Sequence, residues 1–405
     1  MLNTPFSPWP SFTEEEASAV HDVLLSNKVN YWTGQHGREF EKEFAAWADS
    51  RHAIALANGT VALDLALKAL NIGAGDEVIV TSRTFLASAS SIVTAGAVPV
   101  FADVHRDSQN VTAETIAAVL TPRTRAVLCV HLAGWPCDMD PIMALAAEHD
   151  LFVIEDCAQA HGARYKGRSV GSIGHISAWS FCQDKIMTTG GEGGMVTTND
   201  PELWSRMWSY KDHGKSWEAI YEREHPPGFR WVHESFGTNW RMTELQAVIG
   251  RIQLKRMTDW TAARTTNAER IWATCRAFSA VRVPNFRCNA TCGADCASAS
   301  GCAHAHYKCY VQVEPDHLAE GWTRDRIVEE ITARGVPCFQ GSCSEVYLEK
   351  AFDNTGWRPE ARLPVARELG ETSLMFLVHP TLTKAEMDKT CTVLAQVLGE
   401  AGRLA

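Results

Sequence analysis

The sequence predicts an α/β protein with a large domain, built on a mainly parallel β-sheet flanked by helices, and a smaller C-terminal α+β domain. From about residue 54, short β-branched runs alternate with longer helical segments. This alternation is typical of parallel strands covered by helices. From about Val281 the strands become fewer. We therefore expect a large domain at residues 1–255 and a small domain at residues 256–405.

The expected elements follow one another in a regular order. A helical pattern, VALDLALKALNI, precedes the strand DEVIVTS, and the strands PVFADV, AVLCVHLAG and LFVIEDCAQ follow, with the helix DPIMALAAEHD before the last of them. A helix-rich stretch from Met242 to Phe278 connects to the small domain, where YKCYVQVEP and SLMFLVHP predict strands. Ligands of such sheets bind beyond the carboxyl ends of the strands, so the polar residues after each strand are the candidates.

Composition excludes several classes of protein. The 405 residues are 45% hydrophobic, with a formal charge of -10, which argues against a nucleic-acid-binding or anionic-membrane surface. No apolar segment reaches the roughly 18 residues that span a bilayer, and the N-terminus shows no charged region followed by an apolar run. Thirteen cysteines, an odd count, fit reduced thiols, so we predict a cytoplasmic protein without nucleic-acid or membrane partners.

The first candidate junction is ALANGTVALDLAL. It places Asn58, Gly59 and Thr60 at the start of a helix, where free backbone N–H groups and a hydroxyl can bind an anion. A simple N-cap explains these residues equally well.

Two further junctions carry charged groups. Asp156 ends the apolar run of VIEDCAQAHG, and its buried carboxylate needs a cation or donor unless it only caps a helix. Ser180 ends the run ISAWS, and Lys185 follows beside GGEGG, where an exposed lysine before a glycine turn is the plainer interpretation. A Walker P-loop is excluded because the glycines follow the lysine.

Together these three junctions supply what pyridoxal 5'-phosphate requires. Its aldehyde needs a lysine amine, its ring nitrogen a carboxylate, and its phosphate N–H and O–H donors. The order of the three groups along the chain therefore predicts a pyridoxal-phosphate site that contains Lys185.

At these residues the chain resembles the DegT/StrS-type nucleotide-sugar aminotransferases, which have the fold-type-I architecture of pyridoxal-phosphate enzymes. The resemblance runs from about Tyr31 to His379. It rests on WTGQHGREFEKEFA, NGTVALDLAL, GAGDEVIVTSRTFLASA, GAVPVFADV, VHLAGWPCDMD, IEDCAQAHGA, SFCQDKIMTTGGEGG, GTNWRMTELQA and LPVAREL.

The resemblance implies catalytic and ring-binding roles. Lys185 matches the lysine that forms the Schiff base with the cofactor, and Asp156 matches the carboxylate that pairs with the pyridine nitrogen. Gln159 matches the side chain near the phenolic oxygen, and Phe85 matches the aromatic residue that stacks over the ring.

The resemblance also implies the phosphate site and a dimer. Gly59, Thr60 and Ser180 match phosphate-binding positions, and Asn239 in GTNWRM matches a phosphate contact from the neighbouring subunit. A homodimer with shared active sites is thereby implied.

The implied activity moves an amino group from glutamate or glutamine to a keto group of a nucleotide-linked sugar, with pyridoxamine phosphate as the intermediate form. Two alternatives stay open: an aminotransferase for a free keto-cyclitol or keto-sugar of an antibiotic-type pathway, and a cofactor-binding sensor without turnover. A dehydratase branch has histidine in place of the lysine, so Lys185 argues against it.

A cysteine-rich segment departs from the family pattern. Its cysteines lack the paired CxxC spacing of a zinc ribbon, although two histidines would complete enough ligands for zinc or an iron–sulfur cluster. We predict a reduced, thiol-rich surface loop without metal. The residues concerned are Cys288, Cys292, Cys296, Cys302, His304, His306 and Cys309.

Overall fold

The computed structural model describes residues 5–286 and 301–402 and is built on a seven-stranded sheet. The strand order is β1-β9-β8-β5-β4-β2-β3, and β9 runs antiparallel to both of its neighbours while the other pairs are parallel. This confirms the predicted fold class. The strands are β1 (His52–Leu56), β2 (Glu77–Thr81), β3 (Val98–Ala102), β4 (Thr124–Val130), β5 (Phe152–Asp156), β8 (Ile176–Ser180) and β9 (Gly194–Thr198).

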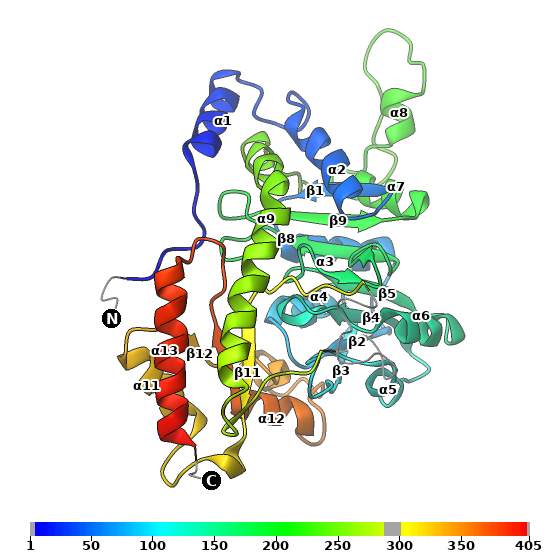
Figure 1. Ribbon diagram of the computed structural model, residues 1–405. Coiled ribbons are helices and arrows are strands. Elements are labelled where there is room, and N and C mark those ends of the chain that lie inside the picture. The colour runs from blue at the N-terminus through cyan, green and yellow to red at the C-terminus, as the bar shows by residue number, and fades with distance from the viewer. Residues whose placement is uncertain (1–4, 287–300, 403–405) are drawn as a thin grey trace.

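Helices cover both faces of this sheet (Figure 1). In β2, Val78 and Val80 pack into one apolar cluster while Ile79 packs into another, which is the period of two that a strand buried on both faces shows. The first cluster includes residues of α3 (Gly59–Ala69), α4 (Leu86–Thr94) and α7 (Pro201–Tyr210). The opposite face is covered by α2 (His36–Trp47), α5 (Ala113–Ala117), α6 (Met139–Glu148) and part of α9.

A second, antiparallel sheet forms the C-terminal part, in the order β10-β11-β13-β12. Its strands β11 and β13 fall within the two strands expected from the sequence. The strands are β10 (Val281–Arg282), β11 (Cys309–Val313), β12 (Cys338–Phe339) and β13 (Ser373–Phe376), and the helices of this part are α11 (Arg324–Ala333), α12 (Pro364–Thr372) and α13 (Lys384–Ala401).

The long helix α9 (Glu244–Cys275) runs past both sheets (Figure 1). It begins with a capping box, in which the Thr243 hydroxyl accepts from the Gln246 N–H and the Gln246 side chain accepts from the Thr243 N–H. It continues without interruption through the expected domain boundary at residue 255, and the exact domain limits stay a prediction.

The remaining elements lie outside the two sheets. They are α1 (Glu14–Leu25), the short hairpin of β6 (Arg164–Tyr165) and β7 (Arg168–Ser169), and α8 (Trp217–Tyr221), which projects from the body with the loop that follows it (Figure 1). Within residues 5–286 and 301–402, no helix combines the length and apolar character that crossing a membrane requires.

Part of the expected surface loop is buried, so that prediction is wrong for residues 302–307. Cys302, His304 and His306 are each at most 9% exposed. The cause is backbone pairing with the large domain: the Ala303 N–H donates to the Arg164 carbonyl at 2.8 Å, and neighbouring residues pair with residues 133–134. Satisfied backbone groups allow this irregular segment to enter the core.

Candidate active site

Three strands of the large sheet end at one edge and carry the predicted site residues there. β1 leads into the turn before α3, β5 ends at Asp156, and β8 ends at Ser180. Since β5 and β8 are parallel neighbours, with Asp156 opposite Ala178, their carboxyl ends open on the same side. The structure therefore brings the three predicted junctions to one edge of the sheet.

Asp156 is only 5% exposed and has defined donors. One carboxylate oxygen accepts from the Ser88 hydroxyl at 2.8 Å, and the other accepts from the Ala158 N–H at 3.0 Å. Burial raises the pKa of Asp156 above its ordinary value, against the lowering effects of those bonds and of the Lys185 charge. Among the described residues no cation forms an ion pair with it, so the buried carboxyl is suited to a cationic ligand.

Gln159 lies near this carboxylate and has a fixed orientation. Its side-chain carbonyl accepts from the Ala133 N–H at 2.9 Å, and Ala133 adopts a left-handed φ of 54°. The bond to the carbonyl oxygen leaves the amide nitrogen of Gln159 as the end that can donate to a ligand.

Gly59 and Ser180 form a tight cradle at the start of α3. A Cβ atom built on Gly59 would lie 2.6 Å from the Ser180 Cβ, so only glycine allows this approach. The Asn58 side chain accepts from the Val61 N–H at 3.0 Å and caps the helix, while Thr60 is exposed at the same end. The first turn of α3 thus offers N–H groups and a hydroxyl to an anion.

Lys185 extends from a turn after β8, and its amine is contacted by Tyr307 and Asp184. Its Nζ lies 3.5 Å from the Tyr307 hydroxyl and 3.6 Å from Asp184 Oδ1. The Tyr307 hydroxyl donates to the other Asp184 oxygen. Although burial acts to raise it, the pKa of Asp184 is lowered by the Lys185 charge and by the Tyr307 hydrogen bond. The ionised carboxylate and the phenol thereby fix the position of the amine.

The two remaining predicted residues are exposed. Phe85, the N-cap residue of α4, is 72% exposed. Asn239 lies between α8 and α9, and the carbonyl of the adjacent Trp240 accepts from the Ala57 N–H at 2.9 Å. That pairing holds the Asn239 segment beside the end of β1.

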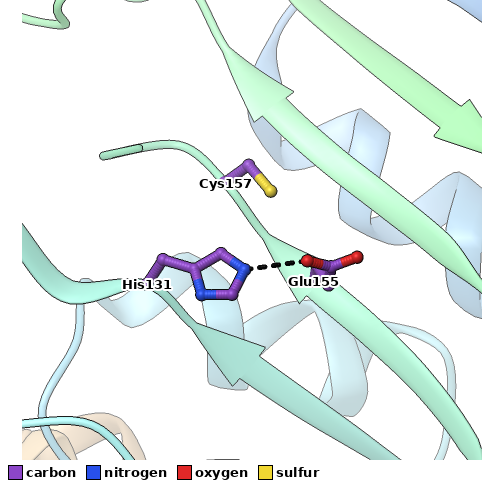
Figure 2. Close-up of side chains that lie close together, drawn as sticks. All are labelled: His131, Glu155 and Cys157. Atoms are coloured by element: carbon purple, nitrogen blue, oxygen red, sulfur yellow. Dashed lines mark hydrogen bonds and ion pairs between the residues drawn. The ribbon is translucent and has the colours of Figure 1, made fainter. Parts of the chain in front are cut away.

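A buried group beside Asp156 has the composition of a metal site. His131, Glu155 and Cys157 lie close together (Figure 2). Hydrogen bonds within the protein occupy the Glu155 carboxylate, which accepts from the His131 Nε2–H at 3.0 Å and from three backbone N–H groups between residues 171 and 174. The other ring nitrogen of His131 accepts from the Cys137 N–H at 3.0 Å. These bonds make the group a structural support for the strand that carries Asp156.

The cysteine-rich segment is only partly described. Cys288, Cys292 and Cys296 lie outside the described residues. Cys302 and Cys309 are buried, and the Cys302 sulfur accepts from the Lys166 N–H at 3.2 Å. The His304 and His306 rings stack with their centroids 4.0 Å apart.

Several site residues were missed by the sequence analysis. Trp9 and Tyr307 come from segments far from Lys185 in sequence, and Asp184 carries no motif of its own. The Trp9 indole N–H donates to the Lys185 carbonyl at 2.8 Å. Ser88 lies within the quoted SRTFLASA block, so its position after the strand DEVIVTS is the one signal that pointed to it.

Comparison with known proteins extends the likeness over the whole chain. A solved structure of an aminotransferase from Psychrobacter cryohalolentis is 67% identical, covers 98% of this chain and 99% of its own, and superposes with a TM-score of 0.94. The GDP-perosamine synthase of Caulobacter vibrioides is 37% identical over 93% of this chain and 95% of its own length. The UDP-N-acetyl-3-dehydro-alpha-D-glucosamine 3-aminotransferase of Acidithiobacillus ferrooxidans is 34% identical over 98% and 96%.

The family model of these enzymes matches residues 10–395, a range that includes all the site residues described above except Trp9. With the sheet topology and the relatives in agreement, the chain belongs to the DegT/DnrJ/EryC1/StrS aminotransferase family.

Proposed function

We propose that the protein transfers an amino group from glutamate or glutamine to the keto group of a nucleotide-linked sugar, with pyridoxal 5'-phosphate as its cofactor. The observation that carries this proposal is the meeting of Lys185, Asp156 and the Gly59–Ser180 cradle at one edge of the sheet. The family assignment and the nucleotide-sugar relatives support it. Those relatives are named for GDP- and UDP-linked compounds, so the nucleotide stays open.

The residues fit this cofactor in charge and shape. Asp156 is a buried carboxyl with no cationic partner among the described residues, as a pyridinium nitrogen requires. The cradle of Gly59 and Ser180, with the exposed Thr60, would hold the phosphate, and the Gln159 amide would donate to the phenolic oxygen. Phe85, exposed at the same edge, would cover the ring.

Lys185 would hold the cofactor covalently through Nζ and serve as the base at that atom. When bound, pyridoxal phosphate supplies an electron sink that lets a proton leave the carbon next to the amino group. Lys185 Nζ would take that proton from the α-carbon of the amino donor and later deliver a proton to the sugar carbon. Asp184 and Tyr307 keep the amine in place during both transfers.

The overall reaction is balanced without a further reactant. With glutamate as donor, the amino acid becomes 2-oxoglutarate, and the keto group of the sugar becomes a primary amine on a C–H carbon. Donor and acceptor thus exchange one amino group and one carbonyl oxygen, and no net oxidation occurs.

We propose further that the active enzyme is a homodimer with shared sites. Asn239 is exposed, and the loop between α8 and α9 also exposes Phe229, Trp231 and Phe236 at 76%, 81% and 99%. Large apolar side chains grouped on a projecting loop are suited to a protein interface. A second copy of this chain would cover these side chains. Asn239 would then reach the phosphate of the cofactor that the second copy holds.

The test is a panel of nucleotide-linked keto-sugars assayed with glutamate and pyridoxal phosphate, with Lys185→Ala as the control. We expect an amino sugar and an equal amount of 2-oxoglutarate for at least one acceptor. Conversion of free keto-cyclitols alone would favour the antibiotic-type alternative. A cofactor absorbance that does not respond to glutamate would favour a sensor without turnover.

A further inference from the structure

A cavity of about 370 Å³ lies next to the side chains that contact Lys185, and its wall includes several residues without an assigned role. Its wall includes Tyr307 and Asp184, the two side chains that contact the Lys185 amine, and it continues past Trp9, Phe339 and His379. The volume falls within the ~300–1,000 Å³ that small-molecule sites occupy. A ligand in this cavity would therefore contact the two side chains that hold the reactive lysine.

Arg264, on α9, lines this cavity and is only 2% exposed. Its Nη1 donates to the carbonyls of His306 and Tyr307 at 3.4 Å, while Nε and Nη2 are buried without a partner among the described residues. The guanidinium lies over the Trp9 ring at 5.0 Å and forms no ion pair within residues 5–286 and 301–402. Burial lowers the pKa of Arg264 to about 9. A buried guanidinium with two unused donors is suited to a planar anion.

Lys308 is a second cation on the same wall. Its Nζ lies 4.9 Å from the centroid of the Tyr307 ring, and no described carboxylate comes within ion-pair distance of it. Burial lowers the pKa of Lys308 to about 8, with smaller lowering by the charges of Arg264 and Lys185 and a raising effect of Asp184. Lys308 is thus cationic at neutral pH without a bound counterion.

The charges around the cavity do not balance. Arg264 and Lys308 line the cavity with a single carboxylate, Asp184, which is already engaged by Tyr307 and by Lys185. His379 adds no positive charge, since burial lowers its pKa to about 4 and leaves the ring neutral. A buried cation such as the Arg264 guanidinium is costly unless an anion pairs with it. The cavity is therefore suited to an anionic ligand.

We propose that Arg264 and Lys308 bind the two carboxylates of a dicarboxylic amino donor, so that the cavity is the donor site and selects glutamate over glutamine. Two cationic side chains match two carboxylates. The cavity wall includes Tyr307 and Asp184, which contact the Lys185 amine proposed to act on the α-carbon of the donor. The inference rests on the proposed aminotransferase function. The same cations also suit the diphosphate of a nucleotide sugar. The experiment therefore compares a dicarboxylate with a diphosphate.

The binding test uses the cofactor-loaded enzyme and two probes, maleate as an unreactive dicarboxylate and UDP as a diphosphate. Calorimetry compares the parent enzyme with Arg264→Gln and Lys308→Met. The matched controls are Arg276→Gln and Lys384→Met, whose parent side chains are exposed. We expect each cavity variant to weaken maleate binding about 10- to 100-fold, the effect of losing a charged hydrogen bond, while the controls bind as the parent does.

Steady-state kinetics supply the second readout. The KM for glutamate should rise in both cavity variants while the KM for the keto-sugar stays the same, and the preference for glutamate over glutamine should fall. If maleate binds but no acceptor reacts, the proposed function fails while the donor site stands. Equal maleate affinity in the parent and both variants, or displacement of maleate by UDP, would overturn the inference. Should Arg264→Gln not fold, as judged by thermal melting, Lys308→Met decides.

A pH series gives an independent check of Lys308. Below its pKa of about 8 Lys308 is charged, so maleate affinity of the parent should fall as pH rises through that value. The other titratable groups that face it are unchanged in Lys308→Met: they are Asp184, Lys185, Arg264, Tyr307 and His379. The variant should therefore lack the step near pH 8. A step of the same size in Lys308→Met would assign it to another group and contradict the role of Lys308.

Discussion

The Nζ atom of Lys185 lies 3.5 Å from the hydroxyl of Tyr307, although 122 residues separate the two in sequence. Lys185 follows a strand of the large sheet, and Tyr307 lies two residues before the start of β11 in the small sheet. The contact therefore joins the two parts of the chain at the reactive amine. The phenol of Tyr307 and the neighbouring Asp184 carboxylate thus hold the lysine amine in one position.

Exchange of Asp156 for Asn should affect the two forms of the enzyme in opposite directions. Burial raises the pKa of Asp156 in the folded cofactor-free protein, so its charge opposes folding at neutral pH and this cost falls as pH drops. Asp156→Asn should therefore melt at an equal or higher temperature without cofactor. Cofactor binding should weaken by ~3–5 kcal/mol, because the pyridinium nitrogen loses its carboxylate. Near-normal transamination by this variant would refute the role.

A methyl group at Gly59 should damage the phosphate cradle. In Gly59→Ala the new Cβ would lie 2.6 Å from the Ser180 Cβ, and relief of this overlap costs ~1–3 kcal/mol. We expect weaker cofactor binding, measured by fluorescence titration, and partial recovery in the double variant with Ser180→Gly. Gly73→Ala is the matched control, since its nearest neighbour would lie at 3.5 Å. Unchanged binding in Gly59→Ala would remove the cradle from the site.

Glu155 should be a stability residue. Burial acts to raise its pKa, but the His131 bond and the backbone donors hold it below the ordinary value. A lowered folded pKa means that the stabilisation is present above the unfolded pKa and is lost as pH falls. Glu155→Gln places an amide N–H2 against those donors, so its free energy of unfolding should be ~1–3 kcal/mol lower at pH 7. Its melting temperature should also fall less steeply than that of the parent as pH drops. Exposed Glu320→Gln should behave as the parent; an equally stable Glu155→Gln would contradict this assignment.

Shared sites predict complementation between two inactive variants. Lys185→Ala and Asn239→Ala, mixed and re-associated, should form a dimer with one doubly defective site and one intact site, so activity should return. Asn239→Ala alone loses one charged hydrogen bond, worth ~1–3 kcal/mol, and excess cofactor must first be shown not to rescue it. A fully active monomer in sedimentation would rule out the shared-site model.

The sequence predicted those parts of the site that follow directly from local patterns. Asp156 and Ser180 end short apolar runs, and such runs form strands of a parallel sheet whose carboxyl ends carry the ligand. The sequence did not predict Tyr307 and Arg264, because their positions depend on how the small domain and α9 pack against the large sheet. It did not predict the burial of Cys302 either, because backbone pairing with residue 164, and not composition, places this segment in the core.

Borohydride reduction identifies directly whether Lys185 is the residue that holds the cofactor. The purified protein is loaded with pyridoxal phosphate, reduced with borohydride, digested and mapped by mass spectrometry, with Lys185→Ala treated in parallel. We predict that the reduced cofactor is found on the peptide that contains Lys185 and that the variant carries no stable adduct and shows no turnover. A reduced adduct on another lysine, such as Lys308, with Lys185 unmodified, would contradict the account.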